Sequence, residues 1–333
     1  MGQHRLIRVA VVGAILLTIA VAASLLLGSS SLPIGLAWDA LRGGPSGTSL
    51  ETGSVWQIRM PRVLVVAVVG AALAGCGAAL QALFRNPMAD PAVLGISSGG
   101  ALAAVVVLFH MPFAPTWVLP LASFAGGFVT AILLLVLSHI GGRPTLTVTL
   151  LTGVILTSLC SSGVSFALLL SDEYQLRQLV FWLAGGAEAR TWQHVWFGAP
   201  PIFAGLLILW SRHRWLDALS LGEDHAGAVG IDVGRARLTI LAGTALATGA
   251  AVSVCGPVGF VGLMVPHLLR PFVGASAASL IPVSALGGAL MLVLADLAAR
   301  VLLPSGIQLG VLTSLLGAPF FLWLLTRSRR TSL

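Results

Sequence analysis

Lysine is missing from this 333-residue chain, in which all 18 basic residues are arginine. The phosphate-binding loop of many ATPases ends in Gly-Lys followed by Ser or Thr. A chain without lysine cannot contain that loop, so any ATP-driven activity must use an ATPase on a separate subunit. Any ATP and Mg²⁺ used in such an activity would bind to that separate subunit, and we expect no cofactor on this chain.

Charged residues of either sign are also scarce, at 9% of the chain against 57% hydrophobic residues, with a mean hydropathy of +0.99. A soluble domain carries roughly 25% charged residues. Several apolar runs approach the roughly 20 residues that a spanning helix needs, and they are continuous rather than alternating, which argues against transmembrane strands. The sequence predicts an all-α polytopic membrane protein.

The formal net charge of +7 is compatible with nucleic-acid binding. Arginines at the cytoplasmic ends of spanning helices explain the same charge better. We expect contact with membrane lipid and no nucleic-acid partner.

Cysteine is rare, and Cys76, Cys160 and Cys255 lie within or beside apolar runs without metal-ligand spacing. They are interpreted as small packing residues, and no metal site is expected. Gly95-Ile-Ser97-Ser-Gly99 matches the nucleophile motif G-x-S-x-G, but that motif requires a strand before the serine and a helix after it. Close helix packing explains these small residues better, and an intramembrane enzyme stays as the alternative from another class.

Apolar runs predict about ten spanning helices in a single transmembrane domain over residues 1–333. The first run resembles a signal peptide and is interpreted as a retained span. The second is rich in Gly and Ala, so we expect it at the centre of the bundle, where small side chains let helices approach closely. The expected spans are 9–27, 63–83, 92–109, 115–137, 146–170, 192–210, 238–254, 258–269, 280–303 and 309–325.

Arginine positions predict the orientation, because cytoplasmic loops carry an excess of basic residues. With the N-terminus inside and alternating spans, twelve arginines are cytoplasmic and six are outside. Both termini are then cytoplasmic in a multi-pass protein. The outer six are Arg42, Arg59, Arg62, Arg177, Arg190 and Arg300.

Arg59, Arg62 and Arg300 therefore stand against the charge bias. They are either docking points for carboxylates of an extracytoplasmic partner or arginines that extend to lipid head groups. Asp296 lies four residues before Arg300 and can pair with it on one helix face. An unpaired acid inside the membrane would instead indicate a proton or cation site.

Two further segments stand out. Residues 215–237 form a polar, patterned insert that suggests two short surface helices, longer than a usual helix–helix loop, and we interpret it as a contact surface for another protein. The breaks Asn86-Pro87 and Asp90-Pro91, together with residues 145–147, either form a cytoplasmic constriction or are turns alone.

Several long blocks, in order, resemble the FecCD family of permease subunits from ABC importers for iron-siderophores, haem and cobalamin. The similar blocks are WQIRMPR at 56–62, FRNPMADPAVLGISSG at 84–99, GPVGFVGLMVPHLLR at 256–270, LADLAAR at 294–300 and GVLTSLLGAPFFL at 310–322. The resemblance covers nearly the whole chain from about residue 56 to 325. It implies the type II ABC importer permease fold, with ten transmembrane helices.

The resemblance also implies partners and residue roles. A second copy of the chain, two copies of a cytoplasmic ABC ATPase and a periplasmic binding protein complete the importer in the bacterial inner membrane. Arg59, Arg62 and Arg300 would receive carboxylates of the binding protein. Coupling to the ATPase would use Leu219, Leu221, Gly222, Glu223, Ala226 and Gly230, and the cytoplasmic gate would include Asn86, Met88, Thr145 and Leu146.

The cargo implied by the family is a whole metal chelate, which agrees with the absence of a Cys/His/Asp/Glu cluster in the sequence. We expect haem or a ferric siderophore, with cobalamin as the alternative. A secondary transporter that works without an ATPase is the rival within transport. The 171–190 tract, with Arg177 and Arg190, is a candidate for contact with cargo.

Overall fold

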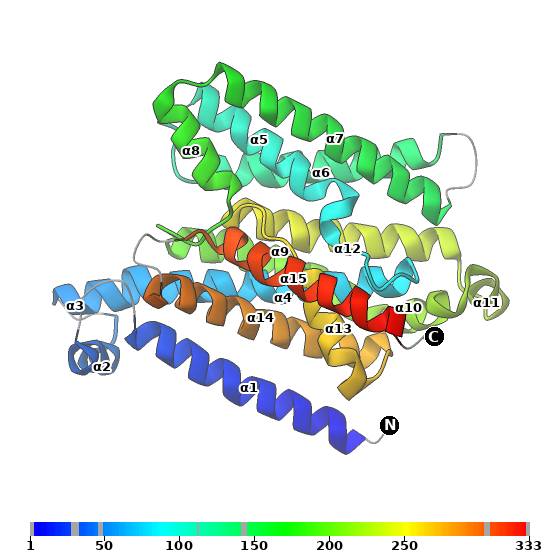
Figure 1. Ribbon diagram of the computed structural model, residues 1–333, viewed down its shortest axis with the longest axis horizontal. Coiled ribbons are helices and arrows are strands. Elements are labelled where there is room, and N and C mark those ends of the chain that lie inside the picture. Colours follow the sequence, from blue (N-terminus) through cyan, green and yellow to red (C-terminus); the bar gives the residue numbers. More distant parts are fainter. Residues whose placement is uncertain are drawn as a thin grey trace.

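The computed structural model describes residues 3–27, 33–45, 49–111, 113–140, 145–302 and 307–330, and all regular structure in these ranges is helical (Figure 1). The all-α expectation is thereby confirmed for this part of the chain. The helices are α1 (Gln3–Leu26), α2 (Ile34–Gly43), α3 (Leu50–Gly53), η1 (Ser54–Arg59), α4 (Met60–Leu83), η2 (Pro91–Leu94), α5 (Ile96–His110), α6 (Val118–Ser138), α7 (Leu146–Leu170), α8 (Glu173–Leu183), α9 (Trp192–Ser211), α10 (His213–Leu221), α11 (Glu223–Ala228), α12 (Val233–Cys255), α13 (Val261–Val273), α14 (Ala277–Leu302) and α15 (Leu309–Arg330).

Seven helices in the described ranges are long and apolar enough to cross a membrane: α1, the continuous helix Leu50–Leu83, α6, α7, α9, α12 and α14. The shorter apolar helices α5, α13 and α15 occupy the positions of the other three expected spans. The order of the apolar segments is as predicted. Seven spans follow from length and composition, and the number ten stays a prediction.

The second span begins earlier than expected. The expected span is 63–83, but the helix that contains α4 starts at Leu50, where the Ser49 hydroxyl accepts a hydrogen bond from the Thr52 amide. It continues through the π-helical turn η1 into α4. Pro61 has no amide hydrogen, and the wider π turn just before it is where the helix accommodates that missing bond.

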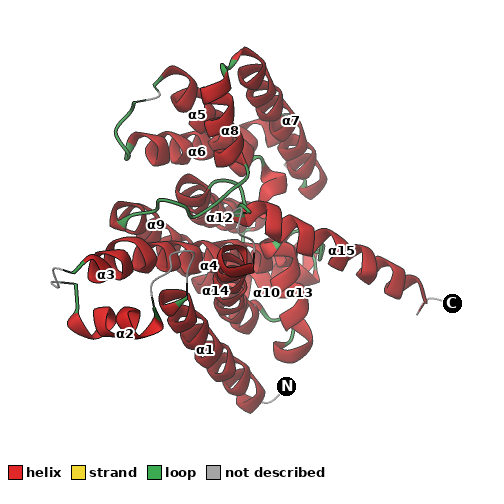
Figure 2. Cartoon of the chain, turned by 60° about the vertical axis from the view of Figure 1, so that its left-hand side comes forward, coloured by secondary structure: helices red, strands yellow, loops and turns green. Residues whose placement is uncertain are grey.

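Helix α4 lies at the centre of the bundle, as its composition predicts (Figure 2). It packs against α14, α12, α9 and α13. A Cβ atom at Gly70 would collide with the backbone carbonyl of Gly288 in α14, and one at Gly77 would collide with Gly262 in α13. The small residues therefore permit backbone contact between helices.

The bundle has three layers and two distinct ends. Helices α5, α6, α7 and α8 form one outer layer, α12, α9 and α4 lie in the middle, and α14, α13 and α1 lie on the other side (Figures 1 and 2). Both termini, α10 and α11 lie at one end, and α2, α3 and α8 lie at the other (Figure 1). We call the end with α10 and α11 the lug end, and the end with α2, α3 and α8 the arginine end.

Candidate functional site

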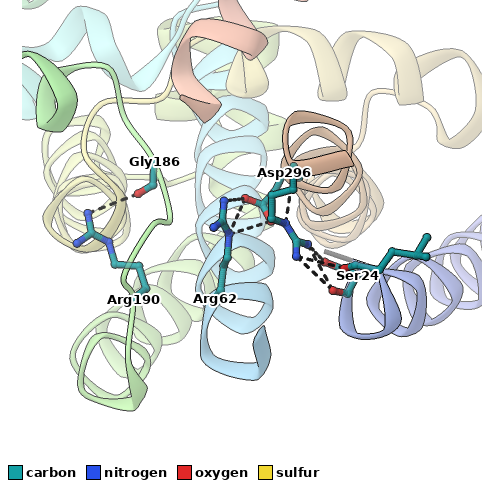
Figure 3. Close-up of polar contacts among 7 residues, drawn as sticks. Ser24, Arg62, Gly186, Arg190 and Asp296 are labelled. Carbon is teal, nitrogen blue, oxygen red and sulfur yellow. Dashed lines mark hydrogen bonds and ion pairs between the residues drawn. The ribbon is translucent and has the colours of Figure 1, made fainter. Parts of the chain in front are cut away.

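The arginine end contains a buried ion-pair cluster that joins α4 to α14 (Figure 3). The Asp296 carboxylate accepts hydrogen bonds from Arg62, with Nε–Oδ1 at 3.0 Å and Nη2–Oδ1 at 2.8 Å. Its Oδ2 lies 2.9 Å from Nε of Arg300, one turn along the same helix. The expected pair of Asp296 with Arg300 is confirmed. The pairing with Arg62, 234 residues away in sequence, was not predicted.

The same arginine end holds the end of α1. The Arg59 guanidinium donates to the backbone carbonyls of Leu25 at 2.8 Å and Leu26 at 2.9 Å. Arg300 also donates to the hydroxyl of Ser24. The last carbonyls of a helix have no intrahelical partner, so cationic donors stabilise this end. Arg59 and Arg300 thus anchor α1 to the bundle.

The three arginines that the sequence singled out differ in how exposed their side chains are. Arg59 is 4% exposed, and the Arg300 side chain is 7% exposed, against 19% for Arg62. Within the described ranges, Arg62 and Arg300 share the one carboxylate of Asp296, and Arg59 lies on the neighbouring end of α1. Arg62 offers the most surface to a partner, and the docking role of the three arginines stays a prediction.

At the lug end, α10 and α11 are the two short helices that the polar insert predicts. Leu219 and Ala226 are buried, whereas Leu221 is 71% exposed. Gly222 follows α10 and Gly230 comes shortly after α11. Their φ angles of +130° and +83° lie in a region that favours glycine. Nη2 of Arg237, in α12, donates to Oε1 of Glu223 at 2.6 Å and fixes α11 to the bundle.

Helix α10 is also bonded to the first turn of α14. The Asp217 carboxylate accepts hydrogen bonds from the Ala277 amide at 2.6 Å and from the Ser276 hydroxyl at 2.9 Å. A carboxylate that receives the free amides at a helix start is a typical N-cap, although here it comes from another helix. Sequence reasoning missed this role of Asp217, since nothing local connects residues 217 and 277.

The expected gate residues lie on two segments that pack together. Oδ1 of Asn86 accepts a hydrogen bond from the Met88 amide at 2.8 Å, and both residues are exposed in the turn before η2. Thr145 caps α7 through its hydroxyl, which accepts from the Val148 amide, and Leu146 follows it. Helix η2 packs on α7 near Val93 and Gly153, and the start of α7 lies at the lug end (Figure 1). This contact lies beyond the predicted gate residues, and their gating role stays a prediction.

A cavity of about 510 Å³ lies between η2, the start of α5, the end of α8 and the first turns of α15. Ser97, Ala184, Pro257 and Ser314 are among its lining residues. A Cβ atom at neighbouring Gly99 would collide with the Thr130 side chain of α6, so the packing interpretation of the G-x-S-x-G match is confirmed. Among the described residues no three His, Cys, Asp or Glu side chains come together as a metal site.

Long apolar helices packed through glycine-rich faces define a multi-pass helical membrane protein. The family model described as the FecCD transport family matches residues 16–327, and the chain belongs to this family. It is a permease subunit of an ABC importer and not an enzyme, with ATP hydrolysis on a separate subunit.

The chain is 44% identical over 284 residues to the vitamin B12 import system permease protein BtuC of Vibrio cholerae, covering 84% of this chain and 85% of that protein. It is 39% identical over 321 residues to the hemin transport system permease protein HmuU of Yersinia pestis, covering 95% and 94%. A solved structure described as an inward-facing metal-chelate type ABC transporter matches with a TM-score of 0.82 and 32% identity, covering 96% and 99%.

Proposed function

We propose that this permease imports a whole metal chelate, haem or a ferric siderophore, from the periplasm to the cytoplasm across the bacterial inner membrane. Two copies of the chain enclose the pathway, and two copies of a cytoplasmic ABC ATPase drive it. A periplasmic binding protein delivers the cargo, and both termini face the cytoplasm. The domain is a single unit over residues 1–333, with ten transmembrane helices.

The connection made by α14 is the observation that carries this proposal. Its first turn is bonded to Asp217 of α10, and its last turns carry Asp296 and Arg300. A single continuous helix therefore joins the two ends of the bundle, over 26 residues from Ala277 to Leu302. Movement imposed on α10 by an ATPase reaches the arginine end through this helix, which supports an alternating-access mechanism.

The lug end has the form expected of a coupling surface. Leu219, Ala226 and the Glu223–Arg237 ion pair fix α10 and α11 to the bundle, while exposed Leu221 and the turns at Gly222 and Gly230 are available to a partner. We assign the seat for the ATPase to residues 215–237. The neighbouring gate uses Asn86, Met88, Thr145 and Leu146.

Docking of the binding protein follows from the charge at the arginine end. Arg59, Arg62 and Arg300 form the proposed docking surface. Within the described ranges, Arg62 and Arg300 share the one carboxylate of Asp296, so acidic side chains of a partner are attracted to this surface. Arg62 makes the first contact because its side chain is the most exposed of the three. Arg59 and Arg300 act mainly by holding α1 and α14 in place.

Cobalamin is a second candidate cargo. The specific observation in its favour is that the identity to the vitamin B12 permease, 44%, exceeds the 39% identity to the hemin permease. The hemin permease matches a larger share of the chain, at 95% against 84%. Identity at this level decides the family and leaves the cargo to experiment.

Reconstitution in liposomes tests the proposal. The permease is assembled with the ATPase and binding protein encoded beside it, and uptake of haem, a ferric siderophore and cyanocobalamin is measured with ATP inside the vesicles. We expect accumulation of one iron chelate, and none when the ATPase is omitted. Uphill transport by the permease alone would refute the proposal, and accumulation of cyanocobalamin only would assign the second cargo.

A further inference from the structure

A second cavity, of about 450 Å³, lies between α5, α8, the connection from α8 to α9 and the residue before α15. It is lined in part by Leu108, Phe181, Trp182, Glu188, Arg190 and Gln308. Helix α8 belongs to the arginine end, so this cavity lies on the side opposite to α10 and α11 (Figure 1). The proposed docking cluster does not include these residues.

Two buried donors in this cavity lining lack acceptors. Nε of Arg190 and Nε1 of Trp182 are buried, and each has no hydrogen-bond partner within the described ranges. Nη2 of Arg190 reaches only the Gly186 carbonyl, at 3.5 Å (Figure 3). A buried donor without an acceptor is destabilising, and more so when the group is charged. An arginine whose buried Nε has no acceptor indicates that a ligand from outside the chain supplies one.

The charges around Arg190 do not neutralise it. Among the described residues no carboxylate lies within 4.0 Å of its guanidinium, since the ion pairs found there involve other arginines. Beyond burial, Cys255 and the exposed Glu188 raise the pKa of Arg190, and Arg62 lowers it. Burial is the main influence on Arg190 and lowers its pKa. The site therefore favours an anion over a neutral ligand.

The backbone at Gly185 and Gly186, at the start of the segment that leads to Arg190, is fixed before any ligand arrives. The Gly186 amide donates to the Cys255 carbonyl at 2.8 Å, and the Gly310 amide donates to the Gly185 carbonyl at 3.0 Å. A Cβ atom at Gly185 would collide with the Pro257 carbonyl, so three backbone segments meet without space for a side chain. A preorganised donor loses little freedom on binding, which increases affinity.

This cavity adjoins the 510 Å³ cavity described above. Residues 182 and 186 line the 450 Å³ cavity, and residues 183 and 184 line the 510 Å³ cavity. Residue 308 likewise lines the 450 Å³ cavity, and residues 310 and 311 line the 510 Å³ cavity. The 510 Å³ cavity also borders Ala92 and Ser97, beside the turn assigned to the gate. Arg190 and Trp182 thus line a cavity at the arginine end that shares its bordering segments with the 510 Å³ cavity.

We propose that Arg190 and Trp182 form an entry site that binds a carboxylate of the cargo, with Phe181 and Trp182 as an aromatic wall for a flat, conjugated ligand. This inference rests on the proposed function and deepens it, because it selects an anionic chelate such as haem over the neutral corrinoid. Arg190 supplies a charge-assisted hydrogen bond, and the Trp182 indole N–H supplies a second donor.

Binding of haem and of its dimethyl ester to the purified permease in lipid nanodiscs tests the site. The two probes differ in the carboxylates alone, and absorbance titration against empty nanodiscs removes the contribution of partition into lipid. We expect haem to bind wild type at least about tenfold more tightly than the ester, a difference of about 1.4 kcal/mol. The Arg190→Gln variant should lose this preference, and Trp182→Phe should reduce it.

Arg42→Gln is the matched control, because Arg42 is exposed in the last turn of α2, at the same end of the bundle, and is not among the residues that line this cavity. It should keep the preference for haem. Arg190→Lys keeps the charge without the guanidinium fork and should retain part of it, which separates loss of charge from loss of folding. A wild-type preference in Arg190→Gln would overturn the proposal.

The carboxylate could instead come from the binding protein, and a docking measurement separates the two sources. If Arg190→Gln weakens capture of the binding protein and leaves haem binding unchanged, the cargo site is refuted. Binding is measured without ATP, so its outcome is independent of transport. Arg190-dependent haem binding in a permease that accumulates nothing would contradict the proposed function and leave the entry site standing.

Discussion

Removal of the Asp296 charge should destabilise the whole bundle. The Asp296 side chain is 2% exposed and faces Arg62 and Arg300, whose side chains are 19% and 7% exposed. An Asp296→Asn substitution keeps the shape and leaves both guanidiniums without their counter-charge. Breaking a buried ion pair by removing one partner costs about 3–5 kcal/mol. We expect the free energy of unfolding to fall by this amount.

A second ion pair in the chain provides the control. Glu173 and Arg177 have the same i, i+4 spacing as Asp296 and Arg300, but their side chains are 91% and 70% exposed. Exposed pairs of this kind contribute about 0.5 kcal/mol or less. Glu173→Gln should therefore leave the unfolding midpoint nearly unchanged, although it removes the same charge at the same spacing.

Equilibrium unfolding in detergent, followed by tryptophan fluorescence and circular dichroism, measures both variants. The double variant Arg62→Gln/Asp296→Asn completes a mutant cycle, and we expect a coupling energy of about 0.5–3 kcal/mol because the two groups touch. An Asp296→Asn protein as stable as wild type, or strictly additive effects in the cycle, would refute the assignment of Asp296 as the counter-charge of this end.

Three other substitutions test the rest of the structure. Asp217→Ala removes the cap of α14, and we expect the free energy of unfolding to fall by about 1 kcal/mol. We also expect a reduced response of transport to ATP. Asp217→Asn keeps an acceptor oxygen and should restore stability. Gly70→Ala places a methyl group against a backbone carbonyl of α14 and should lower the free energy of unfolding, measured by thermal unfolding, by about 1–3 kcal/mol. Gly227→Ala is the control and should cause no measurable loss, because its methyl group meets open space. Burial raises the pKa of Asp90 to about 6, so the folded state holds its proton more tightly than the unfolded state, and stability should fall as pH rises from about 4 to 6. Asp90→Asn should flatten that pH dependence.

The order and type of the helices follow from local signals in the sequence. Each apolar run is continuous, and a helix is the structure that satisfies its own backbone in lipid, so spans of about 20 residues are visible without any tertiary information. The position of α4 was also predictable, because Gly70 and Gly77 leave room only for another backbone. The start of the same helix was not, since the π turn between Ser54 and Arg59 depends on packing.

The candidate site was predictable only where its partners are close in sequence. Asp296 and Arg300 share one helix face, so their pairing follows from spacing. Arg62 reaches the same carboxylate from a helix more than two hundred residues earlier, and Asp217 caps a helix that starts sixty residues later. In the sequence, Arg190 stood out as an outer arginine and, within the 171–190 tract, as a candidate for contact with cargo. That its Nε is buried without an acceptor can be recognised only from the fold.

The two ends of α14 are held in different ways, and this difference bears on how the permease can move. At the lug end α14 is joined to α10 by hydrogen bonds from Ala277 and Ser276 to one carboxylate, which can be broken and remade at low cost. At the arginine end it is held by a buried ion pair, whose rupture costs several kcal/mol. A force applied at α10 therefore displaces the lug end first. In the proposed mechanism α14 would then tilt about its arginine end, and a partner carboxylate that competes with Asp296 for Arg62 would loosen that end as it docks.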